Sequence, residues 1–214
     1  MAGIARVVDS ASSAALQWPD LRATGLQPQD APALQAFYDA YPEYFRIVDG
    51  TPPPATAAAD DLASRPPPDM PWRERWFLGI DEDAASTDTG QPGPRVAVTE
   101  VVSDLLAPGV WHIGLLIVAT PHWGSSLAAR VVHGLEDWAR RAGADWMRLG
   151  VVQANARGLR FWQKQGYTVV RTREPVPFGE LNHRVLVMVK PLRGHTLEHY
   201  LERVSHDRPL LDKT

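Results

Sequence analysis

Residues 121–128 read PHWGSSLA and stand between an apolar run, GLLIVAT, and an amphipathic stretch, ARVVHGLEDWARRAG. Four residues of this segment are small: Gly124, Ser125, Ser126 and Ala128. An anion at a helix N-terminus is bound mainly by free backbone N–H groups and by the positive end of the helix dipole, so such a turn needs room more than basic side chains. The segment therefore predicts a phosphate-binding turn. The alternative, in which the serines only cap an ordinary helix, stays open.

A second polar group follows another strand. The stretch NARGLRFWQKQGY begins with Asn155 directly after WMRLGVV, which is apolar on both faces as a buried central strand should be. Phe161 and Trp162 lie two turns along the predicted helix, and Gly166 ends it. Helix N-termini that follow neighbouring strands face the same edge of a sheet, which is the usual ligand edge. We therefore expect Asn155 and the 121–128 turn to meet at one crevice.

Two residues are candidates for a general base. His112 lies on the strand that leads to the turn, on the other face from Trp111 and Ile113, and an unperturbed pKa of about 6.5 suits proton removal through water. Glu100 lies within the preceding predicted strand. It would be unusual on a buried face and ordinary on an exposed one, and periodicity does not decide between them. A purely structural histidine remains the alternative for His112.

The segment HTLEH at 195–199 matches the inverted zinc-protease pattern, with two histidines one helical turn apart. A third ligand and a cleft would have to come from elsewhere in the chain. A solvated helix is the simpler interpretation, and we predict no metal site.

Hydrophobic periodicity and turn residues place the elements around these groups. The order is strands, helix, strand, helix, strands, which predicts an α/β or α+β sheet with one parallel crossover. We expect an N-terminal arm at 1–18, a single domain at 19–192 and a helical extension at 193–214. Strands are expected at 21–26, 75–80, 95–102, 111–118, 146–152, 167–172 and 184–189, and helices at 31–40, 42–47, 126–142, 155–165 and within 194–207.

Composition excludes several classes of protein. A formal net charge of -3 over 214 residues gives no broad basic field, so nucleic acid is not expected as a partner. The absence of cysteine excludes disulfides, thiolate zinc sites and cysteine nucleophiles, and fits a cytoplasmic location. The longest apolar run, 115–119, is far shorter than the roughly 20 residues that span a bilayer, and no signal peptide is recognised. We expect no membrane segment.

Residues 111–190 together resemble the GNAT N-acetyltransferases, which use acetyl-CoA. Four features in order carry the resemblance: IGLLIV, the loop WGSSLA opening a helix that ends in EDWARRAGA, the strand WMRLGVV, and NARGLRFWQKQGY. The family loop is Arg or Gln, two residues, Gly, one residue, then Gly or Ala. Trp123 falls on the basic or amide position and Ser126 on the first glycine, so only Ala128 agrees with the pattern.

The resemblance implies a mixed, V-shaped sheet of about six to seven strands flanked by helices, with an additional C-terminal helix. It implies that acetyl-CoA is bound as cosubstrate by the motif region 111–167. The backbone of the loop would cradle the pyrophosphate, the end of the preceding strand would bond the pantetheine arm, and the second helix would pack beside it. The residues implied are Trp123, Gly124, Ser125, Ser126, Leu127 and Ala128 for the pyrophosphate, Leu116, Ile117 and Val118 for the arm, and Asn155, Phe161 and Trp162 beside it.

The family often protonates the leaving thiolate with a tyrosine seven residues after the asparagine, where this chain has Trp162. Indole is not a useful proton donor. Tyr167 is a candidate replacement, with a core aromatic as the alternative. The segments 51–73 and 173–181 are expected to shape the acceptor pocket, because loops carry specificity on a rigid scaffold.

The resemblance implies direct acetyl transfer to a primary amine of a small molecule or peptide. Two other hypotheses stay open: a GNAT-like domain that binds coenzyme A without turnover, and an unrelated phosphate-binding α/β domain. Homodimers are frequent in the family, so a homodimer is a further expectation.

Overall fold

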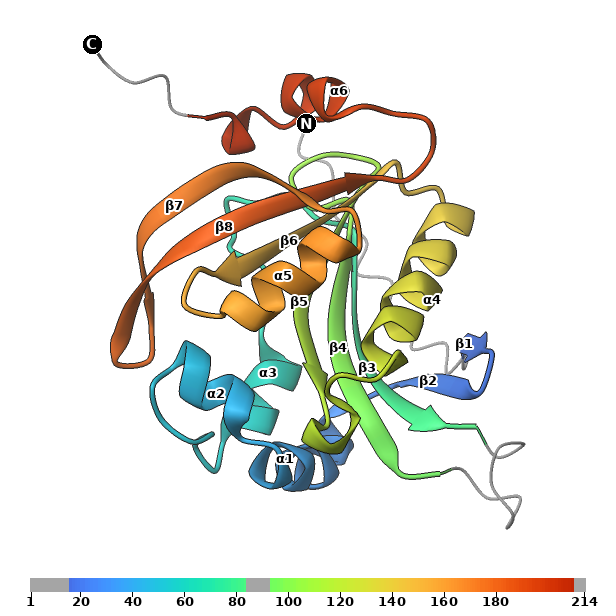
Figure 1. Cartoon of the computed structure of the whole chain (residues 1–214), viewed down its shortest axis with the longest axis vertical. Coiled ribbons are helices and arrows are strands. Elements are labelled where there is room, and N and C mark those ends of the chain that lie inside the picture. The colour runs from blue at the N-terminus through green and yellow to red at the C-terminus, as the bar shows by residue number, and fades with distance from the viewer. Residues whose placement is uncertain (1–15, 84–92, 210–214) are drawn as a thin grey trace, which may run out of the picture.

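The computed structural model describes residues 16–83 and 93–209. Its centre is one sheet in the order β1-β2-β3-β4-β5-β6-β8-β7, in which every neighbouring pair is antiparallel except β5 and β6 (Figure 1). The strands are β1 (Leu16–Trp18), β2 (Leu21–Gly25), β3 (Glu74–Glu82), β4 (Arg95–Ser103), β5 (Val110–Val118), β6 (Trp146–Val152), β7 (Thr168–Phe178) and β8 (Leu181–Pro191).

Helices cover both faces of this sheet (Figure 1). On one face, α4 and α5 pack on the main core, and on the other, α1, α2 and α3 cover a second apolar cluster while α6 covers a third. The helices are α1 (Ala31–Ala40), α2 (Glu43–Val48), α3 (Ala57–Ala63), α4 (Leu127–Arg141), α5 (Ala156–Lys164) and α6 (Leu197–Arg203). Within the described residues, no helix is long and apolar enough to cross a membrane.

Helix α4 carries apolar side chains three or four residues apart, and these form one stripe towards the sheet. The buried members are Leu127, Val131, Leu135 and Ala139. Burying a Val or Leu side chain contributes about 1.5–3 kcal/mol, so the stripe fixes α4 and the turn before it. The helix ends ahead of Gly143, whose φ of +101° glycine adopts without strain.

The parallel pair β5–β6 extends over only the first half of each strand. Val110–Ile113 pairs with Trp146–Leu149, although β5 continues to Val118. Gly114 is an extra residue in β5, since its neighbours Ile113 and Leu115 pair with adjacent residues of β4. A bulge bends the strand that carries it, and beyond this point β5 and β6 separate. The sheet therefore opens into the V shape that the sequence resemblance implied.

The fold expected from the sequence is confirmed, with an eighth strand beyond the six or seven expected. Strand β1 lies in the segment expected to be an arm, because Trp18 is 7% exposed and packs on α4. A Cβ added to Gly134 of α4 would come within 2.5 Å of the Trp18 ring. A strand of only three residues shows no recognisable alternation of apolar and polar side chains, so its packing and not its sequence pattern identifies it. Residues 1–15 of the expected arm lie outside the described residues.

The expectation of a loop at 173–181 is wrong. Strands β7 and β8 continue through this segment and meet at a tight turn that contains Gly179, with a φ of +52°. Pro175 and Pro177 suggested a loop because proline has no N–H for a ladder. Since β7 is the last strand of the sheet, one of its sides needs no ladder, and proline is tolerated there.

The hairpin of β7 and β8 reaches across to α2. The His183 ring nitrogen Nε2 lies 2.7 Å from the carbonyl oxygen of Val48, and the Glu180 N–H donates to the carbonyl of Asp49 at 3.3 Å. Val48 also packs against Val185 in a small separate core. Helix α2 and the hairpin therefore form one wall on that side of the sheet.

The HTLEH segment contacts Asp145 at the surface. His195 Nε2 lies 3.1 Å from the Asp145 carboxylate, and the ring of His199 lies 6.2 Å from that of His195. In the part of the chain that the structure describes, no three His, Cys, Asp or Glu side chains are grouped so that they could hold a metal ion.

Candidate active site

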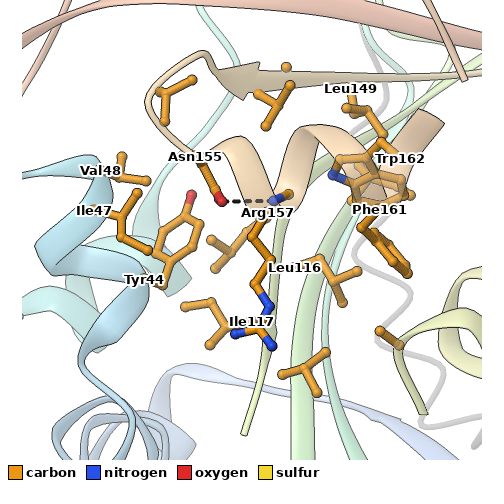
Figure 2. A pocket seen from close by; sticks show the side chains of 18 of the residues that line it. Tyr44, Ile47, Val48, Leu116, Ile117, Leu149, Asn155, Arg157, Phe161 and Trp162 are labelled. Carbon is orange, nitrogen blue, oxygen red and sulfur yellow. Dashed lines mark hydrogen bonds between the residues drawn. The ribbon is translucent and has the colours of Figure 1, made fainter. Parts of the chain in front are cut away.

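A cavity of about 560 Å³ lies where β5 and β6 separate. Helix α2 and the β7–β8 hairpin bound it on one side, and the 121–128 turn and α5 bound it on the other. Figure 2 shows Tyr44, Ile47 and Val48 reaching in from α2. Asn155, Arg157, Phe161 and Trp162 enter from the side of α5 in the same view. Most of the residues predicted for ligand binding thus line one cavity.

The 121–128 turn keeps half of its predicted backbone donors free. Three N–H groups bond within the turn, those of Trp123, Ser125 and Leu127. The other three have no partner among the residues that the structure describes, those of Gly124, Ser126 and Ala128. The Ser125 hydroxyl donates to the His122 carbonyl at 2.7 Å, so it serves the turn itself. Alternate N–H groups at the start of α4 thus remain for an anion.

A cation lies against this turn although the turn contains neither arginine nor lysine. The guanidinium carbon of Arg157, in α5, lies 4.2 Å from the centroid of the Trp123 ring. This is well within the range of about 6 Å for a cation–π interaction. The Trp123 indole N–H donates to the Val118 carbonyl at 2.9 Å, which fixes the ring at the end of β5. Arg157 was missed because nothing in the spacing connects it to Trp123.

The end of β5 supplies backbone to the cavity, as expected for Leu116, Ile117 and Val118. Leu116 and Val118 pack towards α4, whereas Ile117 is buried against the other core. The Val118 carbonyl already accepts the Trp123 indole. The backbone of Leu116 faces an opening instead of a neighbouring strand on the β6 side. An extended ligand could complete the ladder there.

Asn155 is the N-cap residue of α5. Its Oδ1 accepts from the Gly158 N–H at 2.8 Å, shown by the dashed line in Figure 2. Nδ2 has no hydrogen-bond partner among the described residues and belongs to a side chain that lines the cavity. Beyond it, the Phe161 and Trp162 rings pack edge to face with centroids 5.0 Å apart. Trp162 is 8% exposed and presents no acidic proton donor to the cavity.

Glu100 stands at the bulge that opens the sheet. Its Oε1 is paired with Arg75, which also donates to the backbone around α3. Its Oε2 lies over Gly114, where an added Cβ would collide with it. Gly114 lines the cavity, whereas Glu100 is not itself a lining residue. The structure thus places the Glu100 carboxylate between Gly114 and Arg75.

His112 lies at the cavity in contact with a buried ion pair. Arg148 Nη1 is 3.2 Å from His112 Nδ1, while the other guanidinium nitrogens bond the Asp207 carboxylate at 2.6 and 3.1 Å. Because guanidinium only donates, Nδ1 accepts and the proton of the neutral ring is on Nε2. Burial, followed by the charge of Arg148, lowers the pKa of His112 to about 3. This geometry favours a hydrogen-bond donor over a base, and the catalytic assignment of His112 stays a prediction.

Asp207 arrives from the segment after α6. Burial acts to raise the pKa of Asp207, but the hydrogen bonds and charge of Arg148 and the Tyr200 hydroxyl at 2.6 Å outweigh it and hold that pKa below its usual range. Asp207 and Arg148 are 0% and 5% exposed. The C-terminal segment thus neutralises the Arg148 guanidinium, which lines the cavity.

Tyr167, the predicted replacement for the missing tyrosine, does not line the cavity. It is 3% exposed in the main core, where its ring packs on Trp162 with centroids 5.1 Å apart. Burial, and then the Glu136 carboxylate, raise the pKa of Tyr167. Tyr167 is therefore a core aromatic residue, which is the alternative that the sequence left open.

Tyr44 of α2 is a hydroxyl that the sequence did not single out. Its ring lines the cavity and its hydroxyl points inward from the α2 wall (Figure 2). Burial, followed by the charges of Asp49, Asp61 and Glu100, raises the pKa of Tyr44, so the group keeps its proton and can donate. It was missed because, in the sequence, Tyr44 is one of several aromatic residues near a short predicted helix.

The segment 51–73 was expected to shape the acceptor pocket. No residue of 51–73 lines the cavity, and α2 lies in the place expected for that segment.

The opened sheet and the free N–H groups at the following helix leave backbone groups unpaired at one cavity, where an extended, phosphate-bearing ligand would fit. The Acetyltransferase (GNAT) family matches residues 34–167. The chain belongs to this family, and the membership inferred from four motifs is confirmed. No curated protein matches the sequence significantly.

Solved structures agree on the fold. A probable GNAT acetyltransferase from Chromobacterium violaceum is 14% identical, with a TM-score of 0.67, covering 89% of this chain and 96% of that one. An acetyltransferase from Thermus thermophilus is 20% identical, with a TM-score of 0.61, covering 84% and 100%. Spermidine N-acetyltransferase from Vibrio cholerae, solved with CoA and spermine, is 11% identical, with a TM-score of 0.60, covering 81% and 96%.

Proposed function

We propose that this protein transfers an acetyl group from acetyl-CoA to a primary amine of a small molecule or peptide. The observation that carries the proposal is the cavity at the separation of β5 and β6, where free strand backbone and free helix N–H groups meet. The Glu100 carboxylate lies against Gly114 of its lining. Family membership supports the acyltransferase class.

The residues at the cavity fit coenzyme A. The free N–H groups of Gly124, Ser126 and Ala128 would hold the pyrophosphate, and Arg157 supplies the positive charge that the turn lacks. The Leu116 backbone and Asn155 Nδ2 would bond the pantetheine amides. When bound, acetyl-CoA supplies an acetyl thioester, which is the activated group.

The chain's own groups would handle the protons. Amine attack forms a C–N bond and breaks the C–S bond, so the nitrogen must lose a proton and the sulfur must gain one. Glu100, anchored by Arg75 and open over Gly114, accepts the first proton through water. Tyr44 or water donates towards the sulfur, since Trp162 has no hydroxyl and Tyr167 is buried elsewhere.

Thioester consumption with a panel of primary amines tests the proposal. Amine-dependent release of free thiol faster than hydrolysis supports it. The alternative is a domain that binds coenzyme A without turnover, which the tryptophans at positions 123 and 162 favour. Stabilisation by acetyl-CoA in thermal unfolding together with no amine-dependent thiol release would establish that alternative. Equal stabilisation by free phosphate would instead show that the turn binds phosphate without recognising coenzyme A.

A further inference from the structure

Two arginines of β7, Arg171 and Arg173, make no side-chain hydrogen bond or ion pair in the described part of the structure. Arg171 pairs with Val187 and Arg173 with Val185 in the β7–β8 ladder. Cross-strand partners lie on the same face of a sheet. Because Val185 packs on Val48 of α2, both arginines project from the face that α2 covers. The cations of α5 come from a separate element at the turn where coenzyme A would bind.

Neither arginine has a partner within residues 16–83 and 93–209. No hydrogen bond or ion pair in this part of the chain involves the side chain of Arg171 or Arg173, and the Arg171 Nε atom is buried without an acceptor. Arg173 is half-buried and lines the cavity. Guanidinium stays charged in proteins and has five N–H donors, so a buried donor without an acceptor is costly. An anion supplied by a ligand in the cavity would satisfy Arg173, which lines it, whereas Arg171 is not a lining residue.

The described lining of the cavity offers no carboxylate to oppose them. Of the described residues that line it, none is aspartate or glutamate, and Glu100 reaches it only over Gly114 while paired with Arg75. A second ammonium on the acceptor would therefore find no carboxylate among these lining residues and would meet like charge at Arg173. The charges of Asp49, Asp61 and Glu100 act on Tyr44 from outside the lining. The lining that α2 and the hairpin contribute beside Arg173 is aliphatic and aromatic, with Ile47, Val48, Phe178 and the ring of Tyr44.

We propose that the acceptor is a primary amine whose far end carries a carboxylate, which Arg173, with Arg171 beside it, binds across a short apolar segment. This inference rests on the proposed acetyl transfer and narrows its substrate class. Arg173 then selects the acceptor and does not hold coenzyme A. Polyamines are disfavoured by the same charges.

Three amines of equal chain length test the selection: 5-aminopentanoate, pentylamine and 1,5-diaminopentane. The expected kcat/KM is highest for the amino acid, about tenfold above pentylamine, and lowest for the diamine. Arg173→Gln should remove that advantage by raising the KM for 5-aminopentanoate, with the KM for acetyl-CoA unchanged. Arg173→Glu should reverse the order of the two charged amines. Arg184→Gln, at an exposed pair with Glu174 on the same hairpin, is the matched control.

Equal rates for the three amines, or a preference for the diamine, would overturn the inference and leave acetyl transfer intact. No turnover of any amine would count against the proposed function instead. Calorimetric binding of the two products then decides the inference separately: 5-acetamidopentanoate should bind tighter than N-pentylacetamide, and Arg173→Gln should abolish the difference. Equal binding of the products would overturn it.

Discussion

The guanidinium of Arg157 stacks 4.2 Å from the centroid of the Trp123 ring, and both side chains line the cavity at the turn before α4. Trp123 stands where the family loop has Arg or Gln. Its indole is tied to the Val118 carbonyl, so the ring is a fixed platform for a cation from another helix. The positive charge missing from the turn is thus restored from α5.

Replacing Arg157 should weaken acetyl-CoA binding. Hydrogen bonds to a charged group contribute about 1.5–3 kcal/mol, so Arg157→Gln should raise the KM for acetyl-CoA about tenfold or more with little change in kcat. Steady-state kinetics with varied acetyl-CoA measure this. Arg141→Gln, at an exposed position near the end of α4, should leave the KM unchanged. An unaltered KM in the Arg157 variant would remove this residue from the cofactor site.

Removing the Glu100 carboxylate should slow the chemical step. General bases contribute typically about 10²–10⁴-fold, so Glu100→Gln should lower kcat at least about a hundredfold. The remaining rate should rise with pH, because more of the amine is then unprotonated. Glu74→Gln, on the exposed start of the neighbouring strand, is the control. Wild-type kcat in the Glu100 variant would assign proton removal to another group.

Adding a methyl group at Gly114 should act through Glu100. The added Cβ would collide with Oε2, so Gly114→Ala should displace the carboxylate and lower kcat while acetyl-CoA still binds. Calorimetry with coenzyme A separates the two effects. Gly25→Ala, where a Cβ meets nothing within 4 Å, controls for glycine replacement in a strand. Equal kcat values for the two variants would show that Glu100 does not need this opening.

The sequence predicted those parts of the fold that repeat along the chain. Helix α4 was recognised because its apolar residues recur at helical spacing, and the small-residue turn at 121–128 because it joins a strand to that helix. Sequence did not predict the groups that depend on distant pairing. Arg148 and Asp207 are 59 positions apart, and no local pattern connects them. The same holds for Arg157 on Trp123 and for the anchoring of Glu100 by Arg75.

The ion pair of Arg148 and Asp207 should dominate the stability of the C-terminal segment. Breaking a buried pair by removing one partner costs about 3–5 kcal/mol, so Asp207→Asn should lower the free energy of unfolding by that order. Glu202→Gln, exposed on α6, should have little effect. The double change Arg148→Met with Asp207→Leu should recover part of the loss, because no charge is then left buried. Denaturant unfolding measures all three.

Acidification should reduce the stabilisation that the Arg148–Asp207 ion pair contributes. The folded-state pKa of Asp207 is lowered relative to its ordinary value of about 3.9, so its stabilisation is fully present above that value. It is lost as the pH falls through the folded-state pKa. Asp207→Asn should therefore lose less stability than the wild type on acidification below about pH 4. Parallel pH curves for the two proteins would contradict this linkage.

His112 should make the free energy of unfolding depend on pH in a higher pH range than Asp207 does. Its folded-state pKa is about 3 against 6.5 when unperturbed, so between these values the unfolded chain binds a proton that the folded chain does not. Stability from the neutral ring is thus fully present above 6.5 and falls as the pH decreases towards 3, by at most about 1.4 kcal/mol per pH unit. His112→Gln keeps an acceptor for Arg148 but cannot titrate. Its unfolding free energy should depend less on pH between about 6.5 and 5.

His133→Gln, at an exposed position of α4, provides the comparison for loss of an ordinary histidine and should follow the wild type. If His112→Gln also followed the wild type, the ring would titrate normally in the folded protein and could serve as a base near neutral pH. If the slopes differ as expected, the ring stays neutral through that range, with Nδ1 bound to Arg148. Proton removal would then fall to Glu100, whose carboxylate lies against Gly114 of the cavity lining.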